Sequence, residues 1–346
     1  MKNDAAELLV VGVPGTGLDD ATEELLQRVG PGGVILFPRN IESEDQLRGL
    51  IGEIRRLVPD VLLYLDAEGG RVDRLRPLVG PSPSGRALSG QRPAVVQRAG
   101  RWIGRALAGL GFDVDLAPVV DLDYGHRNNA LDERYLGADP KEVIRRAQGF
   151  LLGLHESGVA GCLKHFPGLG AAGEDTHHEG TVIDRTRDEL RRDLLPFQRL
   201  GYFAGAILIG HAIYPDLDPQ RRPASLSPAV ATGLLRWELG FPGVLMSDDL
   251  DMHALEPWGD MSDRAEAALM AGCDVLFLCN SLESAPTVLE RLSEPGLQPR
   301  CQEARERVGA FRSHCQSLSG PARTTSLETV RQRLADLNEA LSEAAG

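Results

Sequence analysis

A short segment in the middle of the chain carries an amine, two imidazoles and a carboxylate. These groups belong to Lys164 and His165, within the run Lys-His-Phe-Pro-Gly, and to Asp175 and His177 shortly after it. Residues 159–163, directly before this segment, form an apolar run that is typical of a buried strand. Proteins built from parallel βα units place their functional groups where such strands end. We therefore predict a functional site at the end of this strand.

A second apolar run, residues 243–246, leads into Ser-Asp-Asp-Leu at positions 247–250. Asp248 would then lie at the end of another strand of the same sheet. Its carboxylate is a candidate partner for the amine and imidazoles of the first segment.

Eight short apolar or β-branched runs predict eight strands. They cover residues 8–13, 33–37, 61–65, 114–120, 159–163, 206–209, 244–246 and 275–278. Amphipathic segments of helical length lie between them, for example over residues 139–155 and 186–200. This alternation argues for a parallel sheet in the α/β class. Eight βα units fit a closed (β/α)8 TIM-type barrel of about 250 residues. A doubly wound open sheet is the alternative, although it usually has fewer strands.

The chain continues beyond the eighth unit. We expect a catalytic barrel over residues 1–297 and a short helical C-terminal extension over residues 298–346 that packs on it. Residues 299–319 are predicted to be helical, with a break at Gly320-Pro321. Thr325 and Glu328 have the spacing of a capping box that opens a final helix.

The composition limits the partners and the compartment. The net charge of −13 argues against nucleic acid as a partner, and no apolar run approaches the roughly 20 residues that span a bilayer. The first apolar run is too short for a secretory signal. The five cysteines form no CxxC pair, which argues against a thiolate metal site. We expect a cytoplasmic monomer with no nucleic-acid or membrane partner.

The predicted strand ends carry polar side chains that a barrel would bring to one mouth. These are Asp66 and Arg74 after the third strand, Asp121 and Arg134 after the fourth, Lys164 and His165 after the fifth, and His211, Asp248 and Asn280 after the last three. Each has a structural alternative. An aspartate after a strand often caps the next helix, Arg74 could pair with Glu68 or Asp73, and His211 could be a buried, hydrogen-bonded histidine.

Together these residues resemble glycoside hydrolase family 3, and in particular its short, single-domain bacterial β-N-acetylglucosaminidases. The resemblance extends from about residue 8 to residue 280. Its most specific elements are Lys164-His165-Phe166-Pro167-Gly168, Asp175-Thr176-His177, Ser247-Asp248-Asp249-Leu250 and the run Asp66-Ala67-Glu68-Gly69-Gly70-Arg71-Val72. Other branches of the family lack the Asp-x-His element and take their acid from elsewhere.

The resemblance implies a retaining hydrolase that removes terminal β-linked N-acetylglucosamine, with fragments of peptidoglycan (GlcNAc-1,6-anhydro-MurNAc peptides) as its substrate in cell-wall recycling. Asp248 would be the nucleophile, His177 the general acid and then the base, and Asp175 the residue that orients His177. The substrate-binding residues would be Asp66, Arg74, Arg134, Lys164, His165 and His211. No metal and no organic cofactor is implied.

The chemistry of these residue types fits this assignment. A retaining glycosidase needs a nucleophile on one side of the sugar and a proton donor on the other. An imidazole can donate because its ordinary pKa of about 6.5 lies near neutrality, and Asp175, two residues from His177, would raise that pKa. The chain departs from the usual family pattern at Leu169, where a histidine is common, and at residues 179–181, which lack a common proline.

Three other functions remain open from the sequence. A metal-dependent hydrolase could use the histidines and aspartates, although the first strand has no His-x-His pair and Lys164 would repel a cation. A phosphorylase is compatible with a histidine acid, which repels phosphate less than a glutamate would. A non-catalytic sugar-binding barrel would use the same residues without turnover.

Overall fold

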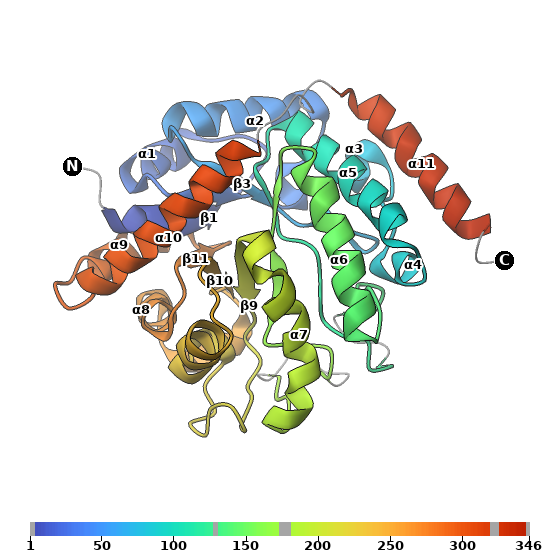
Figure 1. The fold of residues 1–346 in the computed structure, drawn as a ribbon. Helices are drawn as coiled ribbons and strands as arrows, with labels where there is room; N and C mark the ends of the chain where they lie inside the picture. Colours follow the sequence, from blue (N-terminus) through green and yellow to red (C-terminus); the bar gives the residue numbers. More distant parts are fainter. Residues whose placement is uncertain (1–3, 127–130, 173–180, 319–324, 344–346) are drawn as a thin grey trace.

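The alternating apolar runs form parallel strands that close into a barrel, as predicted (Figure 1). The computed structural model describes residues 4–126, 131–172, 181–318 and 325–343. The strands are β1 (Leu9–Gly12), β2 (Gly33–Ile35), β3 (Leu62–Leu65), β6 (Val114–Asp115), β7 (Ala160–Gly161), β8 (Leu163–Phe166), β9 (Ala206–Ile209), β10 (Val244–Asp249) and β11 (Val275–Leu278). Their order in the sheet is β7-β6-β3-β2-β1-β11-β10-β9-β8.

The two ends of this order are one interrupted strand. Only Cys162 separates β7 from β8 in the sequence. β7 pairs in parallel with β6, and β8 pairs in parallel with β9. The nine strand segments therefore close an eight-stranded (β/α)8 barrel, which confirms the predicted fold class.

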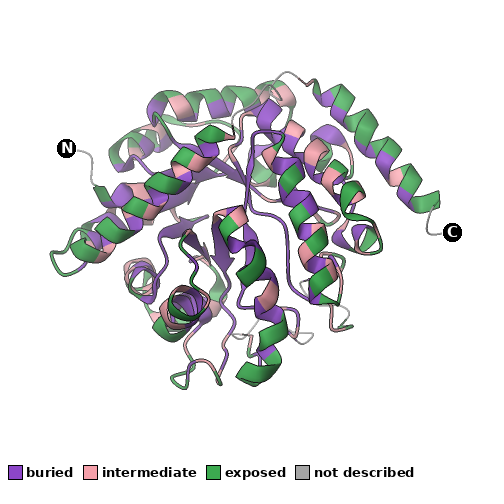
Figure 2. Ribbon diagram, viewed as in Figure 1, coloured by how far each residue is buried: buried purple, intermediate pink, exposed green. Residues whose placement is uncertain are grey.

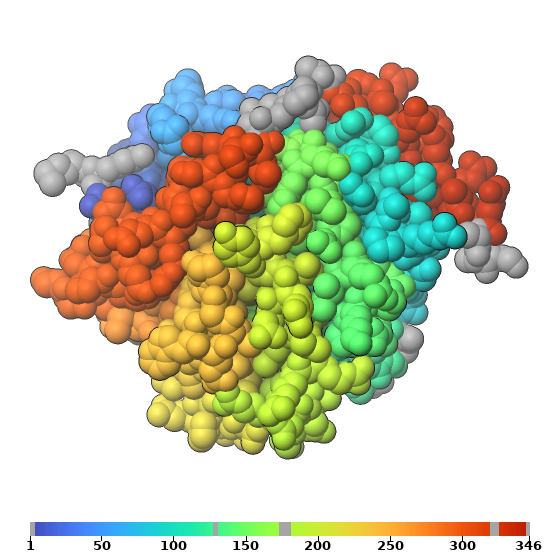
Figure 3. Space-filling model, in the orientation of Figure 1, coloured from blue at the N-terminus to red at the C-terminus, as the bar shows by residue number. Residues whose placement is uncertain are grey.

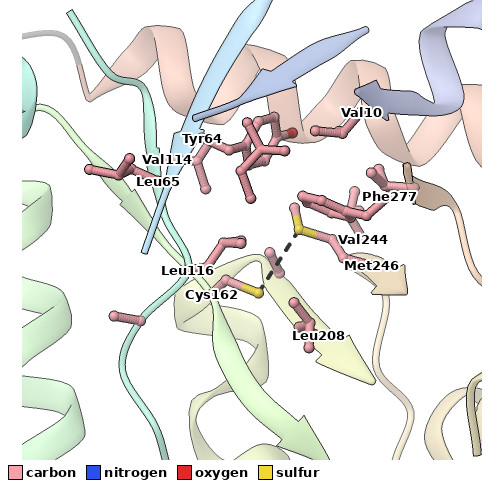
Figure 4. Packing of buried hydrophobic residues seen from close by; sticks show 14 of the residues in the cluster. Val10, Tyr64, Leu65, Val114, Leu116, Cys162, Leu208, Val244, Met246 and Phe277 are labelled. Atoms are coloured by element: carbon pink, nitrogen blue, oxygen red, sulfur yellow. Dashed lines mark hydrogen bonds between the residues drawn. The ribbon is translucent and has the colours of Figure 1, made fainter. Parts of the chain in front are cut away.

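Side chains from several strands fill the centre of the barrel (Figure 4). Tyr64 from β3 and Phe277 from β11 meet edge to face, with ring centroids 5.6 Å apart. Cys162 points toward Met246 from β10, and their sulfur atoms are 3.9 Å apart. The interior is therefore a packed core, and room for a ligand exists only toward its ends.

Amphipathic helices cover the outside of the barrel and turn their apolar faces toward the strands (Figure 2). They are α1 (Asp20–Val29), α2 (Glu44–Leu57), α3 (Arg76–Val79), α4 (Gly85–Ser89), α5 (Pro93–Leu110), α6 (Pro140–His155), α7 (Arg187–Ala204), the π-helix Ala229–Glu238, α8 (Met261–Ala271) and α9 (Ala285–Leu292). Short 3-10 turns cover Asp4–Leu8, Pro38–Asn40, Ala224–Leu226, His253–Trp258 and Leu282–Ser284. No helix in the described ranges is both long and apolar enough to cross a membrane.

Local capping explains where the two helices predicted from periodicity begin. The Asp139 side chain accepts the N–H groups of Lys141 and Glu142 at the start of α6. Thr186 and Glu189 form a reciprocal capping box at the start of α7. These caps satisfy N–H groups that have no partner within the helix.

The C-terminal helices pack on the barrel. α10 (Gln298–Ser317) contacts the amino end of the barrel, where the Arg312 guanidinium donates to the Gly32 carbonyl just before β2. It also lies beside the end of α7 (Figure 3). α11 (Leu327–Glu343) packs on α3 and α5. The Oγ of Ser326 accepts the Thr329 N–H at 3.2 Å, so the predicted cap at Thr325 is wrong by one residue. The predicted break at residues 320–321 lies outside the described residues.

Two strands of the site run further than predicted, and one is shorter. β8 includes Lys164 and His165, and β10 includes Asp248. The predicted strand over residues 114–120 is regular only at Val114 and Asp115. Polar side chains can lie in a buried strand when other parts of the barrel supply charged partners. The periodicity of one strand does not show those partners, so the predicted strands end too early.

Candidate active site

Lys164 lies at the centre of a charged network at the carboxyl end of the barrel. It is 3% exposed, and its Nζ lies 2.7 Å from Asp66 Oδ1 and 2.5 Å from Glu68 Oε1. Burial disfavours the ammonium, but the two carboxylates outweigh it and raise the pKa of Lys164 above its ordinary value. Lys164 is therefore charged at neutral pH, and it places Asp66, which is half-buried, at the mouth of the barrel.

Glu68 joins this network to Arg134. Arg134 grips the carboxylate with two bonds, Nε to Oε2 at 2.7 Å and an Nη to Oε1 at 2.8 Å. Burial opposes ionisation of Glu68, yet Arg134 and Lys164 outweigh it and lower the pKa of Glu68 to about 2. A bidentate, charge-assisted pair of this kind holds the guanidinium in one orientation.

A tight hairpin presents Glu68 to its partners. The strands β4 (Ala67–Gly69) and β5 (Val72–Asp73) pair antiparallel directly after β3. Gly69 and Gly70 turn the chain with φ angles of 93° and 62°. A Cβ on Gly69 would lie 2.1 Å from the Pro83 carbonyl oxygen, so only glycine fits this turn.

Asp121 orients His165 next to this network. His165 Nδ1 lies 2.7 Å from Asp121 Oδ2, and the Leu169 N–H donates to Asp121 Oδ1 at 2.6 Å. The other ring nitrogen, Nε2, is 3.3 Å from an Nη of Arg134. An acceptor on Nδ1 favours the tautomer with its proton there, which leaves Nε2 as the acceptor facing Arg134.

Asp248 lies in β10 and is electrostatically coupled to the same groups. Burial raises its pKa, but His211, His165, the Asp249 N–H and Lys164 together outweigh burial, so the pKa of Asp248 falls below its ordinary value. Its Oδ1 accepts the Asp249 N–H at 2.9 Å. The carboxylate is partly exposed and ionised at neutral pH, as a nucleophile must be.

His211 supports this region from the loop that follows β9. It is 6% exposed, its Nδ1 lies 2.7 Å from Ser225 Oγ, and its Nε2 lies 2.9 Å from the Asp249 carbonyl oxygen. Burial lowers the pKa of His211, and the nearby Asp248 carboxylate and the Asp249 backbone only partly oppose this shift. Because both ring nitrogens have partners within the protein, the geometry favours a buried, hydrogen-bonded histidine over a direct sugar ligand.

Arg74 has an unused donor. Its Nε is buried without a hydrogen-bond partner among the described residues, while its backbone N–H donates to the Asp66 carbonyl at 3.2 Å. Glu68 pairs with Arg134 and Lys164, and Asp73 accepts the Ser82 N–H. The alternative that Glu68 or Asp73 holds Arg74 is therefore wrong.

Asp175 and His177 lie outside the described residues. The described residues on either side are held next to the site. Tyr214 donates its hydroxyl to the Gly168 carbonyl at 2.8 Å, and the Ile213 N–H donates to the Thr181 carbonyl at 2.7 Å. The described residues that flank positions 173–180 therefore lie beyond the carboxyl ends of β8 and β9.

Glu68 and Asp121 are site residues whose roles are not predicted from the sequence. Glu68 belongs to one of the family motifs and Asp121 follows a predicted strand, but their partners are distant in the chain. The helix-capping alternative does not hold for Asp121 or Asp248, because Asp139 caps α6 and Asp260 caps α8. Among the described residues, no group of three or more His, Cys, Asp or Glu side chains has the arrangement of a metal site.

Comparison with known proteins identifies the family. The model of the glycosyl hydrolase family 3 N-terminal domain matches residues 1–310. The chain belongs to glycoside hydrolase family 3. The resemblance drawn from the motifs is confirmed at the level of the family, and this family 3 chain is a glycoside hydrolase.

Its relatives cover nearly its whole length. A protein of Pseudomonas aeruginosa named beta-hexosaminidase is 39% identical over 84% of this chain and 88% of its own. A beta-hexosaminidase of Idiomarina loihiensis is 37% identical over 94% of this chain and 99% of its own. Among solved structures, NagZ from Neisseria gonorrhoeae in complex with N-trifluoroacetyl-D-glucosamine superposes on this family 3 hydrolase with a TM-score of 0.78, at 28% identity, over 95% of this chain and 97% of that one.

Proposed function

We propose that this glycoside hydrolase removes terminal, non-reducing β-linked N-acetylglucosamine with retention of configuration. The observation that carries the proposal is the convergence of an ionised Asp248 and the Lys164 network at one end of the barrel. A nucleophile and a set of polar groups able to hold hydroxyls then face the same sugar ring.

The Lys164 network would bind the sugar. Asp66 offers carboxylate acceptors for sugar hydroxyls, and Lys164 and Arg134 offer donors whose orientations Glu68 fixes. The buried Nε of Arg74 offers a further donor. Such preorganised groups bind a sugar with little loss of side-chain entropy, because the protein has already ordered them.

Asp248 would attack the anomeric carbon and form a covalent glycosyl intermediate. Its lowered pKa keeps the carboxylate ionised at neutral pH. His177 would protonate the leaving oxygen in the first step and deprotonate water in the second, and Asp175 would orient its ring. The described ends of the segment that carries both residues lie on the side of the barrel where β8 and β9 end.

The relatives support the proposed substrate. Those that match over most of the chain are named beta-hexosaminidases, and the Neisseria structure contains an N-acylated glucosamine. An N-acylated amino sugar is therefore the expected glycone. We propose fragments of peptidoglycan, GlcNAc-1,6-anhydro-MurNAc peptides, as the substrate, and the cytoplasm as the place where they are degraded.

A panel of aryl glycosides tests the glycone. Nitrophenyl β-glycosides of GlcNAc, GalNAc, glucose and xylose would be compared with the anhydromuropeptide. We expect the two GlcNAc compounds to turn over fastest. Proton NMR of the first sugar released should show the β anomer, and a slowly hydrolysed fluorinated GlcNAc fluoride should label Asp248 in a digested peptide. Release of the α anomer first, or a label elsewhere, would contradict the mechanism.

The same assay with added phosphate separates hydrolysis from phosphorolysis. Hydrolysis predicts free GlcNAc as the product in phosphate buffer. Accumulation of GlcNAc-1-phosphate would assign the chain to the phosphorylases instead. Turnover that persists after dialysis against a chelator would exclude a metal-dependent mechanism.

A further inference from the structure

Strand β10 contains an irregularity at the residue proposed as nucleophile. Met246 is opposite Val275 of β11, but Asp249 is opposite Phe277, so three steps along β10 match two along β11. The other edge of β10 is regular, with Val244 to Ser247 in register with Ala206 to Ile209 of β9. β10 therefore contains one residue more than β11 between these two pairs, and this irregularity is a β-bulge on the edge of β10 that faces β11.

Two side chains of β10 accept backbone N–H groups at the bulge, one from β11 and one from the residue directly after it. The Phe277 N–H donates to Ser247 Oγ at 3.1 Å, and the Cys279 N–H donates to Asp249 Oδ1, also at 3.1 Å. Ser247 is completely buried, so its bond to the Phe277 N–H is shielded from water, and solvent would not replace a lost hydroxyl there. Ser247 and Asp249 flank Asp248 and hold the bulge on both sides of it.

The Asp249 carboxylate is also anchored beyond the sheet. Its Oδ1 accepts the Asp251 N–H at 3.1 Å, and its Oδ2 accepts from Asn280 Nδ2 at 3.2 Å. The peptide that joins Asp248 to Asp249 is held as well, because its N–H donates to Asp248 Oδ1. The direction of the Asp248 carboxylate therefore depends on where Asp249 is fixed.

We propose that Ser247 and Asp249 are positioning residues, whose side chains hold a β-bulge that aims the Asp248 carboxylate at the sugar. Bulges next to active sites redirect a side chain out of the regular alternation of a strand. Here, the two side-chain acceptors tie the bulge to the N–H groups of Phe277 and Cys279. The inference rests on the proposed role of Asp248 as nucleophile.

Removal of each acceptor tests the proposal. Ser247→Ala and Asp249→Ala should each lower kcat on an aryl GlcNAc by on the order of 10²-fold, the loss expected for a reactive group misplaced by about 1 Å. Inhibition by free GlcNAc should keep its Ki, because Asp66, Lys164 and Arg134 bind the sugar independently of the bulge. If the two side chains only stabilised the fold, their loss would lower the amount of folded enzyme, but the folded molecules would keep a normal kcat as well as a normal Ki.

Two comparisons make the test specific. Ser157→Ala is a matched control, since Ser157 is also completely buried and donates from Oγ to the carbonyls of Arg101 and Gly153, near the start of β7. It should reduce stability without changing kcat. Asp249→Asn keeps an oxygen in the place of Oδ1 and should recover most of the kcat that Asp249→Ala loses. If Ser247→Ala does not fold, the comparison of Asp249→Asn with Asp249→Ala decides the outcome.

Three results would overturn the inference. If the folded Ser247→Ala and Asp249→Ala enzymes have the same kcat as Ser157→Ala, the positioning role is refuted, but the nucleophile is not. The same holds if Asp249→Asn is as slow as Asp249→Ala. Full turnover by Asp248→Asn would refute the proposed nucleophile and, with it, the positioning role.

Discussion

Neutralising Glu68 should destabilise the protein far more than neutralising an exposed glutamate. In the folded protein the Glu68 side chain is 4% exposed and bonded to both Arg134 and Lys164. Its pKa is about 2, compared with an ordinary value of 4.5. At 1.36 kcal/mol per unit, this difference corresponds to about 3 kcal/mol, which agrees with the roughly 3–5 kcal/mol typical of breaking a buried ion pair. We therefore expect Glu68→Gln to lose about 3 kcal/mol near neutral pH.

Urea unfolding followed by circular dichroism measures this loss. The midpoint should fall while the slope with denaturant stays constant, because the surface exposed on unfolding does not change. Glu156→Gln is the matched control. Glu156 pairs with Arg101 at 2.5 Å, but its side chain is 43% exposed, so its replacement should cost less than about 1 kcal/mol.

The pH dependence has a defined sign. Because the pKa of Glu68 is lower in the folded state than in the unfolded state, its carboxylate contributes fully to the free energy of unfolding above about pH 4.5. This contribution is lost as the pH falls toward about 2. The difference between wild type and Glu68→Gln should therefore be smaller at about pH 4 than near neutrality. The assignment of this stability to the buried ion pairs would be refuted if Glu68→Gln and Glu156→Gln lowered the free energy of unfolding equally. It would also be refuted if the difference between wild type and Glu68→Gln increased as the pH fell.

Three further predictions concern catalysis and acid stability. Asp248→Asn should lower turnover of an aryl GlcNAc by at least about 10³-fold while the protein remains folded, as measured by circular dichroism. His177→Ala should cost about 10²–10⁴-fold with a poor leaving group and little with a nitrophenolate, and equal losses would remove His177 from the acid role. Burial and His314 lower the pKa of His155 to about 4, so wild-type stability should fall as pH drops from about 6.5, and His155→Leu should reduce this fall in urea titrations.

The local pattern of the sequence was sufficient for the barrel and for its reactive motifs. Hydrophobic periodicity and caps such as Asp139 depend on residues a few positions apart, and the strands at 206–209 and 275–278 have their predicted bounds. The motifs around Lys164 and Asp248 are sufficient to indicate the family. These features can be predicted from the sequence because they depend on residues close together in the chain or on short sequence motifs.

The partners of each charged group were decided by the tertiary structure alone. Glu68 binds Arg134 and Lys164, which follow it by 66 and 96 positions, and nothing in the spacing distinguishes these partners from Arg74. The bulge that carries Asp248 is bonded to the N–H groups of Phe277 and Cys279, about 30 positions away. Barrel closure brings these groups together in the protein interior, where each charge or polar N–H requires a partner. The order and spacing of residues along the chain do not specify which distant residues meet in this way.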